Sequence, residues 1–423
     1  MYMTVGQEKY LEVLRAALWA GLCGGSDSAA RTDSTGNPTS ASNEMNAPCA
    51  ALDDEIRLLA KQQATAGLVC STSDDPRCRQ EMVRQIISHE KLNSALKGVT
   101  SLLNDNGINN VLLKGQGLAS YYSQPMLRNC GDIDLYVGMK NYEKACRLLL
   151  DVAKKDAAND ANAGKDAAVN DASNAPARDT ANALSVSENN KHFTLSYHGV
   201  PVELHRVSAV PPTPLKAKIY RKYEASGLTR NLVPVEIDGR TVNTPEDTFN
   251  ALYIFIHFFY HFLSFGIGLR QVCDWTMFLY KRGKFVDRAK LENMLDALGL
   301  MKPWKTFGVI AVDTLGLPAG EMPFYDPSYS RKAQKVLERI FVTGNFGKNK
   351  AWKKYSRASY FMKKTSSVYL HTVNAVATFL IFPKQATLAY ISMLVEGFRQ
   401  VFREKFNHPG KHGAAEEAEE ATR

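Results

Sequence analysis

The hydrophobic pattern changes its period twice along the chain, and this constrains the fold more than any other feature. Apolar residues recur at helical spacing as far as residue 104, and helical spacing returns from residue 244. Between them, after the Asn106-Gly107 turn signal, lie the short strand patterns INNVLL, DIDLYV and HFTLSY–HG–VPVELHRV. The helices expected before and between these strands cover residues 6–20, 51–67, 78–104, 116–123 and 140–152. This order predicts an α+β fold with a small mixed-sheet core.

Three regions follow from this pattern. We expect an N-terminal helical region at 1–105, an α/β core at 106–240 and a C-terminal helical region at 241–423. Two segments interrupt them: 24–48 is rich in small and polar residues, and 154–190 has almost no large apolar side chain. Because neither can bury enough surface to offset its ordering entropy, both are predicted to be mobile insertions.

Charge and cysteine content limit the partners and the compartment. The formal net charge of +9 favours anionic partners such as nucleotides, nucleic acid or a membrane surface. The seven cysteines include no CxxC pair, which favours a reducing cytoplasm over a disulfide framework or a structural zinc site. The sequence contains no window of eighteen uninterrupted apolar residues, so no transmembrane helix is predicted.

The strand DIDLYV carries the first candidate site. Asp132 and Asp134 are two residues apart, so both point to one face of the strand, while Ile133 and Leu135 point to the other. Two neighbouring carboxylates repel each other unless a cation lies between them, and Mg²⁺ prefers such oxygen ligands. The alternative is an ordinary exposed D-x-D at a strand edge, which the dipeptide alone does not exclude.

Two further segments strengthen the cation-site hypothesis. Upstream, Lys114 and Gly115 follow a strand and open a helix, where backbone N–H groups can approach a phosphate. Downstream, Glu203 and His205 share one face of VPVELHRV, and an antiparallel neighbour would bring Glu203 beside the aspartates. The alternatives are a plain glycine turn and a solvent-facing glutamate.

The order of these motifs resembles the DNA polymerase beta nucleotidyltransferase superfamily, whose pattern is a glycine turn, an hDhDh strand and a later third acid. The chain is more closely similar to an uncharacterised bacterial nucleotidyltransferase family with the signature V-L-L-K-G…R-x-x-G-D-I-D-L-x-V. The matching residues here are Val111–Gly115, Arg128, Gly131–Leu135 and Val137, then Glu203-Leu204-His205, and then Gly268, Leu269, Arg270, Gln271, Asp274 and Trp275.

The resemblance covers roughly residues 50–290, with two departures. The usual Gly-Ser of the superfamily's turn is Lys114-Gly115 here, so a serine contact to the phosphate is missing. The insertion at 154–190 separates Asp134 from Glu203, although the remaining spacing suits a helix plus one strand.

The resemblance implies an enzyme that moves a nucleoside monophosphate from an NTP, with ATP among the candidate donors, to an acceptor. Asp132, Asp134 and Glu203 would hold two Mg²⁺ ions, and Glu203 would complete the second metal site or act as general base. The residues expected to contact the NTP are Lys114, Gly115, Arg128, Gly131, Arg270 and Asp274. The alternative is a non-catalytic nucleotide-binding or regulatory module with the same fold.

Several features remain open from the sequence. His257 and His261 are four apart on one helical face, which suits core or substrate-lining residues better than metal ligands. Arg270 and Asp274 have the spacing of a simple helix pair as well as of an anion site. The acceptor can be a small molecule, a sugar or a protein; nucleic acid is not favoured. The basic C-terminal helix can dock on the core or contact a membrane surface.

Overall fold

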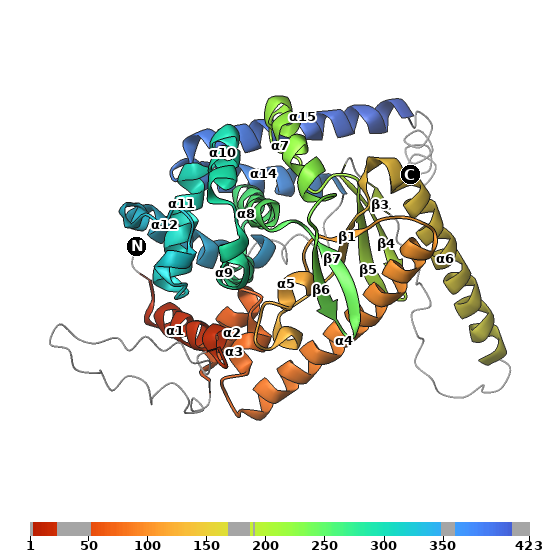
Figure 1. Ribbon diagram of the computed structural model, residues 1–423, viewed down its shortest axis with the longest axis horizontal. Coiled ribbons are helices and arrows are strands. Elements are labelled where there is room, and N and C mark those ends of the chain that lie inside the picture. Colours follow the sequence, from red (N-terminus) through yellow and green to blue (C-terminus); the bar gives the residue numbers. More distant parts are fainter. Residues whose placement is uncertain (1–2, 23–51, 168–186, 189–190, 348–359, 408–423) are drawn as a thin grey trace, which may run out of the picture.

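The computed structural model describes residues 3–22, 52–167, 187–188, 191–347 and 360–407. The insertion predicted at 24–48 lies outside these residues. The fold is α+β, as the sequence predicts, with a small mixed sheet flanked by helices (Figure 1).

The N-terminal region consists of four helices whose ends follow local capping chemistry. They are α1 (Val5–Trp19), α2 (Asp54–Gln62), α3 (Ala66–Cys70) and α4 (Pro76–Asp105). Thr4 and Gln7 form a capping box on α1, and Asp75 caps α4, whose first residue is Pro76. The single helix predicted at 51–67 is divided into α2 and α3, because the backbone of Ala64 has a positive φ of 58°.

The main sheet has five strands in the order β1-β2-β5-β4-β3. The strands are β1 (Val111–Leu112), β2 (Ile133–Tyr136), β3 (Ser187–Glu188), β4 (His192–Tyr197) and β5 (Val200–His205). β2 and β5 are parallel, and the other neighbours are antiparallel, so the sheet is mixed. The short helix α5 (Gln116–Ala119) follows β1 and covers less than the predicted 116–123.

The expectation that the strand carrying Glu203 is antiparallel to β2 is wrong, because β5 runs parallel to β2. The chain leaves β2 through α6 (Gly138–Ala167), returns along β4 and turns back at His198-Gly199 into β5. Since the hairpin adds a second reversal, β5 has the direction of β2. The register still places Asp134 directly beside Glu203.

Part of the insertion predicted at 154–190 has regular secondary structure. Helix α6 continues to Ala167, and β3 pairs with β4 inside the predicted range. The mobility of the segment stays a prediction, although residues 154–167 and 187–188 have regular secondary structure. The reason for the helix is the alanine content, because alanine has the highest helix propensity and lets α6 continue without a large apolar face. Residues 168–186 and 189–190 lie outside the described part.

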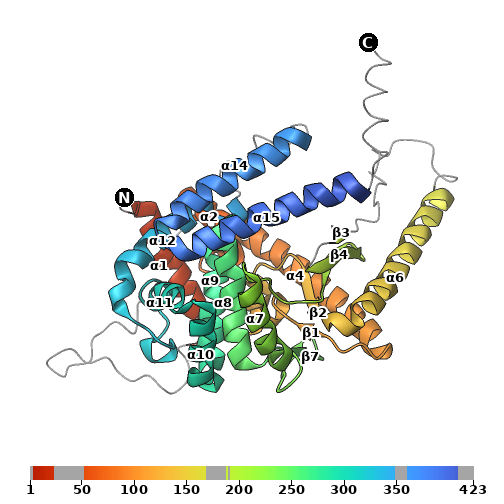
Figure 2. The same cartoon turned by 90° about the horizontal axis from the view of Figure 1, so that it is seen from above.

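After β5 the chain forms a helix and a two-stranded hairpin, which lie largely within 106–240, and then continues as helices. These elements are α7 (Pro214–Gly227), β6 (Val233–Ile237), β7 (Arg240–Thr244), α8 (Asp247–Ser264), α9 (Leu269–Arg282), α10 (Arg288–Leu298), α11 (Met301–Val309), α12 (Ser330–Thr343), α14 (Tyr360–Phe379) and α15 (Pro383–Asn407). Figure 2 shows α14 and α15 side by side. Among the described residues, no helix combines the length and apolar character that crossing a membrane requires.

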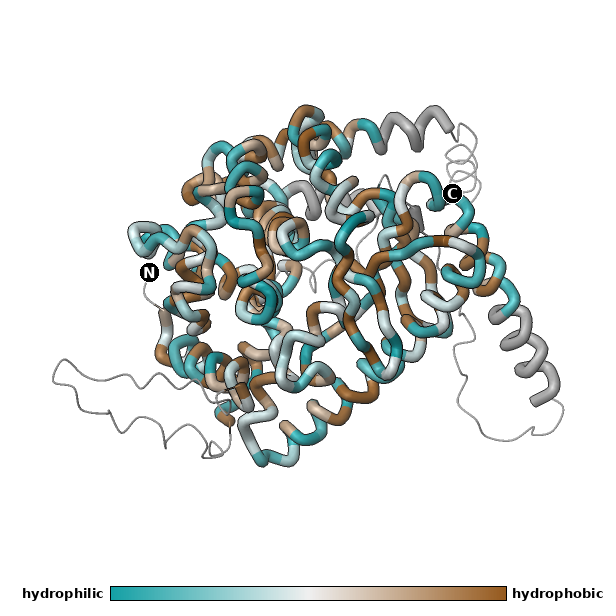
Figure 3. Tube along the Cα trace, in the orientation of Figure 1, coloured by the Kyte–Doolittle hydropathy of each residue, from teal (hydrophilic) through white to brown (hydrophobic). Residues whose placement is uncertain are grey.

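Two hydrophobic clusters place the site between them. The sheet packs on α4 and α6, whereas α1–α3 share a larger core with α8–α12. Trp19 of α1, for example, donates a hydrogen bond from Nε1 to the carbonyl of Leu315 at 2.7 Å. Hydrophobic and hydrophilic residues alternate along many of the helices (Figure 3). Such a pattern is typical of helices that bury one apolar face. The N-terminal and C-terminal helices thus form one body, and α8 runs through it towards the sheet.

Candidate active site

Three carboxylates lie close together where the neighbouring strands β2 and β5 run side by side. Asp132 precedes β2, Asp134 lies within it, and Glu203 lies beside Asp134 on β5. One oxygen from each of the three carboxylates lies within 4.8 Å of the others. The side chains named from the period-two pattern therefore share one face, close enough to hold one cation.

Asp134 is the most deeply buried of the three. Its side chain has no exposed surface, and its Oδ2 lies 3.2 Å from Lys114 Nζ, while its Oδ1 lies 2.9 Å from His205 Nε2. Burial alone would raise the pKa of Asp134, but the charge of Lys114 and the contact with His205 outweigh it and hold the pKa well below its usual range. Asp134 is thus ionised in the interior.

The neighbouring charges raise the pKa values of both Asp132 and Lys114. The negative charge of Asp134, followed by burial, raises the pKa of Asp132 above its ordinary value. Burial favours the neutral form of Lys114, yet Asp134, Asp132 and Glu203 together raise its pKa, so the ammonium stays charged. Lys191 and Arg270 add further positive charge near the acids. The case for a cation therefore rests on the three carboxylate oxygens, which lie within 4.8 Å of one another. This donor set fits a hard divalent cation.

The turn before α5 brings the backbone close to Asp132. Gly115 has φ 65° and ψ −121°, a conformation that residues with a side chain rarely adopt. A Cβ at this position would lie 3.3 Å from the carbonyl oxygen of Asp132. Because α5 has only four residues, its dipole adds little, and the turn contributes mainly its close backbone approach.

Replacing Gly115 by Ala should lower stability by about 1–3 kcal/mol, because the new side chain would force a strained backbone beside Asp132. Thermal or denaturant unfolding measures the change. Gly131→Ala is the matched control, since Gly131 lies next to Asp132 without a positive φ, and a Cβ there would have no neighbour within 4 Å. Equal stability of the two variants would contradict the proposed strain at Gly115.

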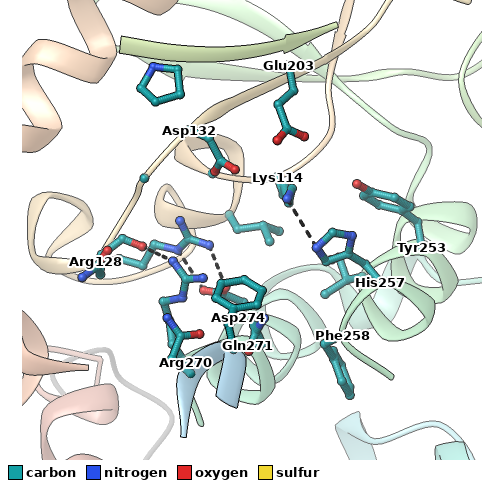
Figure 4. Close-up of a pocket in the computed structure, with 18 residues that line it drawn as sticks. Lys114, Arg128, Asp132, Glu203, Tyr253, His257, Phe258, Arg270, Gln271 and Asp274 are labelled. Atoms are coloured by element: carbon teal, nitrogen blue, oxygen red, sulfur yellow. Dashed lines mark hydrogen bonds and ion pairs between the residues drawn. The ribbon is translucent and has the colours of Figure 1, made fainter. Parts of the chain in front are cut away.

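A cavity of about 440 Å³ opens in front of the acids (Figure 4). The sheet side contributes Lys114, Asp132 and Glu203. The opposite wall comes from α8 and α9, which follow the sheet in the sequence. The lining residues on the helical side include Tyr253, Ile254, His257, Phe258, Arg270, Gln271 and Asp274, with Asn345 and Phe346 beyond them.

Arg128 and Asp274 form a buried ion pair in the wall of this cavity. Arg128 donates from Nε and Nη2 to the two carboxylate oxygens of Asp274, at 3.0 and 2.7 Å, and Tyr122 donates its hydroxyl to Oδ1 at 2.8 Å. Burial would raise the pKa of Asp274, but Arg128 outweighs it and lowers the pKa. Asp274 therefore pairs with Arg128, not with its helical neighbour Arg270. The role of both residues in NTP binding stays a prediction.

Arg270 is a cavity-wall cation that forms no ion pair with the described residues. Its Nη1 donates to the carbonyl of Asn129 at 2.5 Å, while its buried Nε has no hydrogen-bond acceptor. Burial, followed by the nearby charge of Arg128, lowers its pKa. A buried guanidinium that faces a cavity in this way suits an anionic ligand.

The two histidines of α8 lie behind Lys114. His257 Nε2 is 3.3 Å from Lys114 Nζ, and Figure 4 shows this contact at the cavity wall. Burial lowers the pKa of His257 well below its ordinary value and that of His261 to about 3, so both rings are neutral. Within the described part of the chain, neither belongs to a group that could hold a metal. His257 is thus a lining residue.

Sequence reasoning missed two groups at the site. His192 on β4 lies directly opposite His205, and Tyr253 on α8 lines the cavity. The strand pattern HFTLSY contained the signal for His192, because a hairpin with a two-residue turn fixes which residues face each other. Tyr253 had no such local signal, since only tertiary packing brings α8 to the sheet.

Comparison with known families matches residues 57–316 to a family described as "Uncharacterised nucleotidyltransferase". This is more than half of the 423 residues and includes the three carboxylates, the Gly115 turn and the wall formed by α8 and α9. Neither the curated proteins nor the solved structures that were compared gave a match.

Proposed function

The chain belongs to this family of uncharacterised nucleotidyltransferases, and from that premise we propose that it transfers a nucleoside monophosphate from an NTP to an acceptor. The observation that carries the proposal is the convergence of three carboxylates, of which Asp132 and Glu203 line a cavity with cationic walls and Asp134 is buried beside them. The order of glycine turn, D-x-D strand and third acid supports membership in the DNA polymerase beta superfamily. We propose Asp132, Asp134 and Glu203 as the catalytic residues.

We propose that Asp132, Asp134 and Glu203 would hold two Mg²⁺ ions, and their clustered oxygens support this proposal. When bound, the ions would supply positive charge beside the triphosphate and the attacking oxygen. The fit rests on the raised pKa of Asp132, which reflects carboxylates that repel each other, and on ligands that are all oxygens.

The residues of the chain would bind the NTP and handle the proton. Lys114 and Arg270 lie at the cavity and can bind phosphate oxygens, while Gly115 and Gly131 leave the backbone open to close approach. An acceptor hydroxyl oxygen then bonds to the α-phosphorus, the bond from that phosphorus to the β-phosphate oxygen breaks, and pyrophosphate leaves. The carboxylate of Glu203 would complete the second metal site or accept the hydroxyl proton as general base. Arg128 and Asp274 would support the wall behind these contacts.

Calorimetric titration with each NTP, with and without Mg²⁺, tests donor binding; ATP is the first donor to try. We expect binding that depends on Mg²⁺, followed by pyrophosphate release once a suitable acceptor is present. Incubating a lysate with the purified chain and each radiolabelled NTP reveals the acceptor as labelled product. Binding without release across small molecules, sugars and proteins would favour the non-catalytic alternative, and failure to bind any NTP would contradict both.

Glu203→Gln should slow transfer by roughly 10²-fold or more while changing NTP affinity far less, because general base catalysis contributes on this scale and acts on the acceptor. Single-turnover rates and calorimetric Kd values separate the two effects. Glu143→Gln is the control, since Glu143 is an exposed glutamate on α6. An equal loss in rate and in affinity would contradict the assignment of Glu203 to the acceptor side.

We further propose peripheral contact of the C-terminal helices with an anionic membrane surface. Val376 of α14, Leu380 of the following turn, and Ile391 and Phe398 of α15 are exposed apolar side chains. The end of α15 carries Arg399 and further basic residues. An apolar face with a basic rim suits a lipid interface. Sedimentation with anionic and with neutral vesicles tests this contact, and equal recovery from both would contradict it.

We also propose a cytoplasmic location and a division of the chain into three regions. Cys70, Cys78, Cys130, Cys146 and Cys273 are free thiols among the described residues, which supports a reducing cytoplasm. The division at residues 105 and 240 is supported by the location of the acids in 106–240, although the two flanking helical regions share one core.

A further inference from the structure

Two histidines lie on the same sheet face as the third acid. The β4–β5 register places His192 directly opposite His205, and Glu203 precedes His205 by two residues on β5. Residues two apart on a strand point to the same face. Two imidazoles and a carboxylate from adjacent strands therefore lie close together, next to the three-acid cluster, with which they share Glu203.

The distances between these groups are those of ligands around one ion. Glu203 Oε2 lies 3.2 Å from His205 Nε2 and 3.6 Å from His192 Nδ1, and the two ring centroids are 4.9 Å apart. Ligand atoms bonded to Zn²⁺ at about 2.0–2.1 Å are separated by roughly 3.4 Å in a tetrahedral arrangement. The three donors thus need little movement to bind an ion.

The contacts of His205 favour a cation over a simple hydrogen bond. Its Nε2 faces Asp134 Oδ1 at 2.9 Å as well as Glu203 Oε2 at 3.2 Å, while its buried Nδ1 has no hydrogen-bond partner. One N–H group can donate well to only one of these two oxygens. With its proton on Nδ1, His205 has its Nε2 lone pair available for a cation, which would neutralise the two carboxylate oxygens that face it. The partly exposed side chains of His192 and Glu203 leave access for water as a further ligand.

From this geometry we infer that His192, His205 and Glu203 bind a transition-metal ion, distinct in ligand type from the Mg²⁺ position at Asp132 and Asp134. Imidazole ligands suit Zn²⁺ and other first-row transition metals, whereas Mg²⁺ prefers oxygen alone. Glu203 belongs to both groups and would bridge them. Any catalytic meaning of this ion rests on the proposed nucleotidyl transfer, but its binding does not.

Pulsed electron paramagnetic resonance of Mn²⁺ bound to the full-length chain tests the inference. We expect hyperfine coupling to ¹⁴N from imidazole, and retention of about one equivalent of Zn²⁺ after desalting into excess Mg²⁺. His192→Ala should remove part of the ¹⁴N coupling and weaken Zn²⁺ binding at least tenfold. His198→Asn is the matched control, because His198 is an exposed histidine of the same hairpin in a left-handed conformation that Asn tolerates.

The two proposals fail in different ways. Purely oxygen coordination of Mn²⁺ in the wild-type chain, together with Zn²⁺ that Mg²⁺ displaces, would overturn the histidine site even if transfer occurs. Nitrogen coordination in a chain without any transfer activity would contradict the proposed function and leave the metal site standing. Because the spectrum is first recorded on the wild-type chain, the test does not depend on the folding of a variant.

Discussion

Asp132→Asn should abolish nucleotidyl transfer and leave the fold intact. Asp132 lines the cavity, and the neighbouring charge of Asp134 raises its pKa, so folding disfavours its ionised form. Removing that charge relieves repulsion, and stability near pH 7 should therefore stay the same or rise slightly. The loss would be confined to cation binding and the chemistry that depends on it.

The expected loss of rate is at least about 10³-fold. A metal ion contributes several kcal/mol of charge stabilisation in the transition state, and each 1.36 kcal/mol corresponds to a factor of ten in rate. Single-turnover pyrophosphate release measures the rate, and thermal unfolding verifies the fold. Asp151→Asn, an exposed aspartate of α6, is the control. Turnover at the wild-type rate in Asp132→Asn would remove Asp132 from the active site.

Asp134→Asn is expected to lose activity and also stability. Asp134 is wholly buried against Lys114 and His205, so its replacement leaves the lysine charge less balanced. Because folding lowers the pKa of Asp134 below its ordinary value of 3.8, its contribution to stability is present above that pH and is lost as the pH falls through the lower, folded value. The variant should thus show a weaker loss of stability on acidification.

The faces of the strands could be predicted from the sequence, but their direction could not. Alternation in DIDLYV and VPVELHRV places Asp132 with Asp134, and Glu203 with His205. Alternation is the same for a strand read in either direction, so it carries no information about parallel or antiparallel pairing. Three acids could therefore be named correctly as neighbours although the expected direction of β5 was wrong.

Local signals were present for some elements that sequence reasoning did not use. The hairpin β6–β7 surrounds Asp238-Gly239, an Asp-Gly turn between alternating strand residues. The cavity wall had no comparable signal. Arg128 and Asp274 are 146 residues apart, and only the packing of α9 against the core brings them together. The four-residue spacing on a helix suggested Arg270 as the partner of Asp274. Instead, two guanidinium nitrogens of Arg128 donate to the two carboxylate oxygens of Asp274.

Asp274→Ala should destabilise the protein by about 3–5 kcal/mol, because it leaves the Arg128 guanidinium buried without its countercharge. The side chains of Arg128 and Asp274 are 4% and 5% exposed, so water cannot replace the lost partner. Chemical denaturation measures the change. Asp326→Ala is the control: Asp326 pairs with Lys305 in a more exposed position, and such a pair should matter far less.

A double-mutant cycle identifies the cause of this loss and separates it from ligand binding. Arg128→Met combined with Asp274→Ala should be more stable than Asp274→Ala alone, since the uncompensated charge is gone. Folding lowers the pKa of Asp274, so the stability it contributes is present above pH 3.8 and decreases as the pH falls below it; the double variant should lack this decrease.

Calorimetry with NTP, well below the unfolding temperature, shows whether Arg128 also binds the nucleotide. Unchanged affinity in the double variant would make Arg128 and Asp274 supports of the wall, whereas a loss of tenfold or more would make Arg128 a phosphate ligand. Stability of Asp274→Ala equal to that of the wild type would contradict the uncompensated-charge argument.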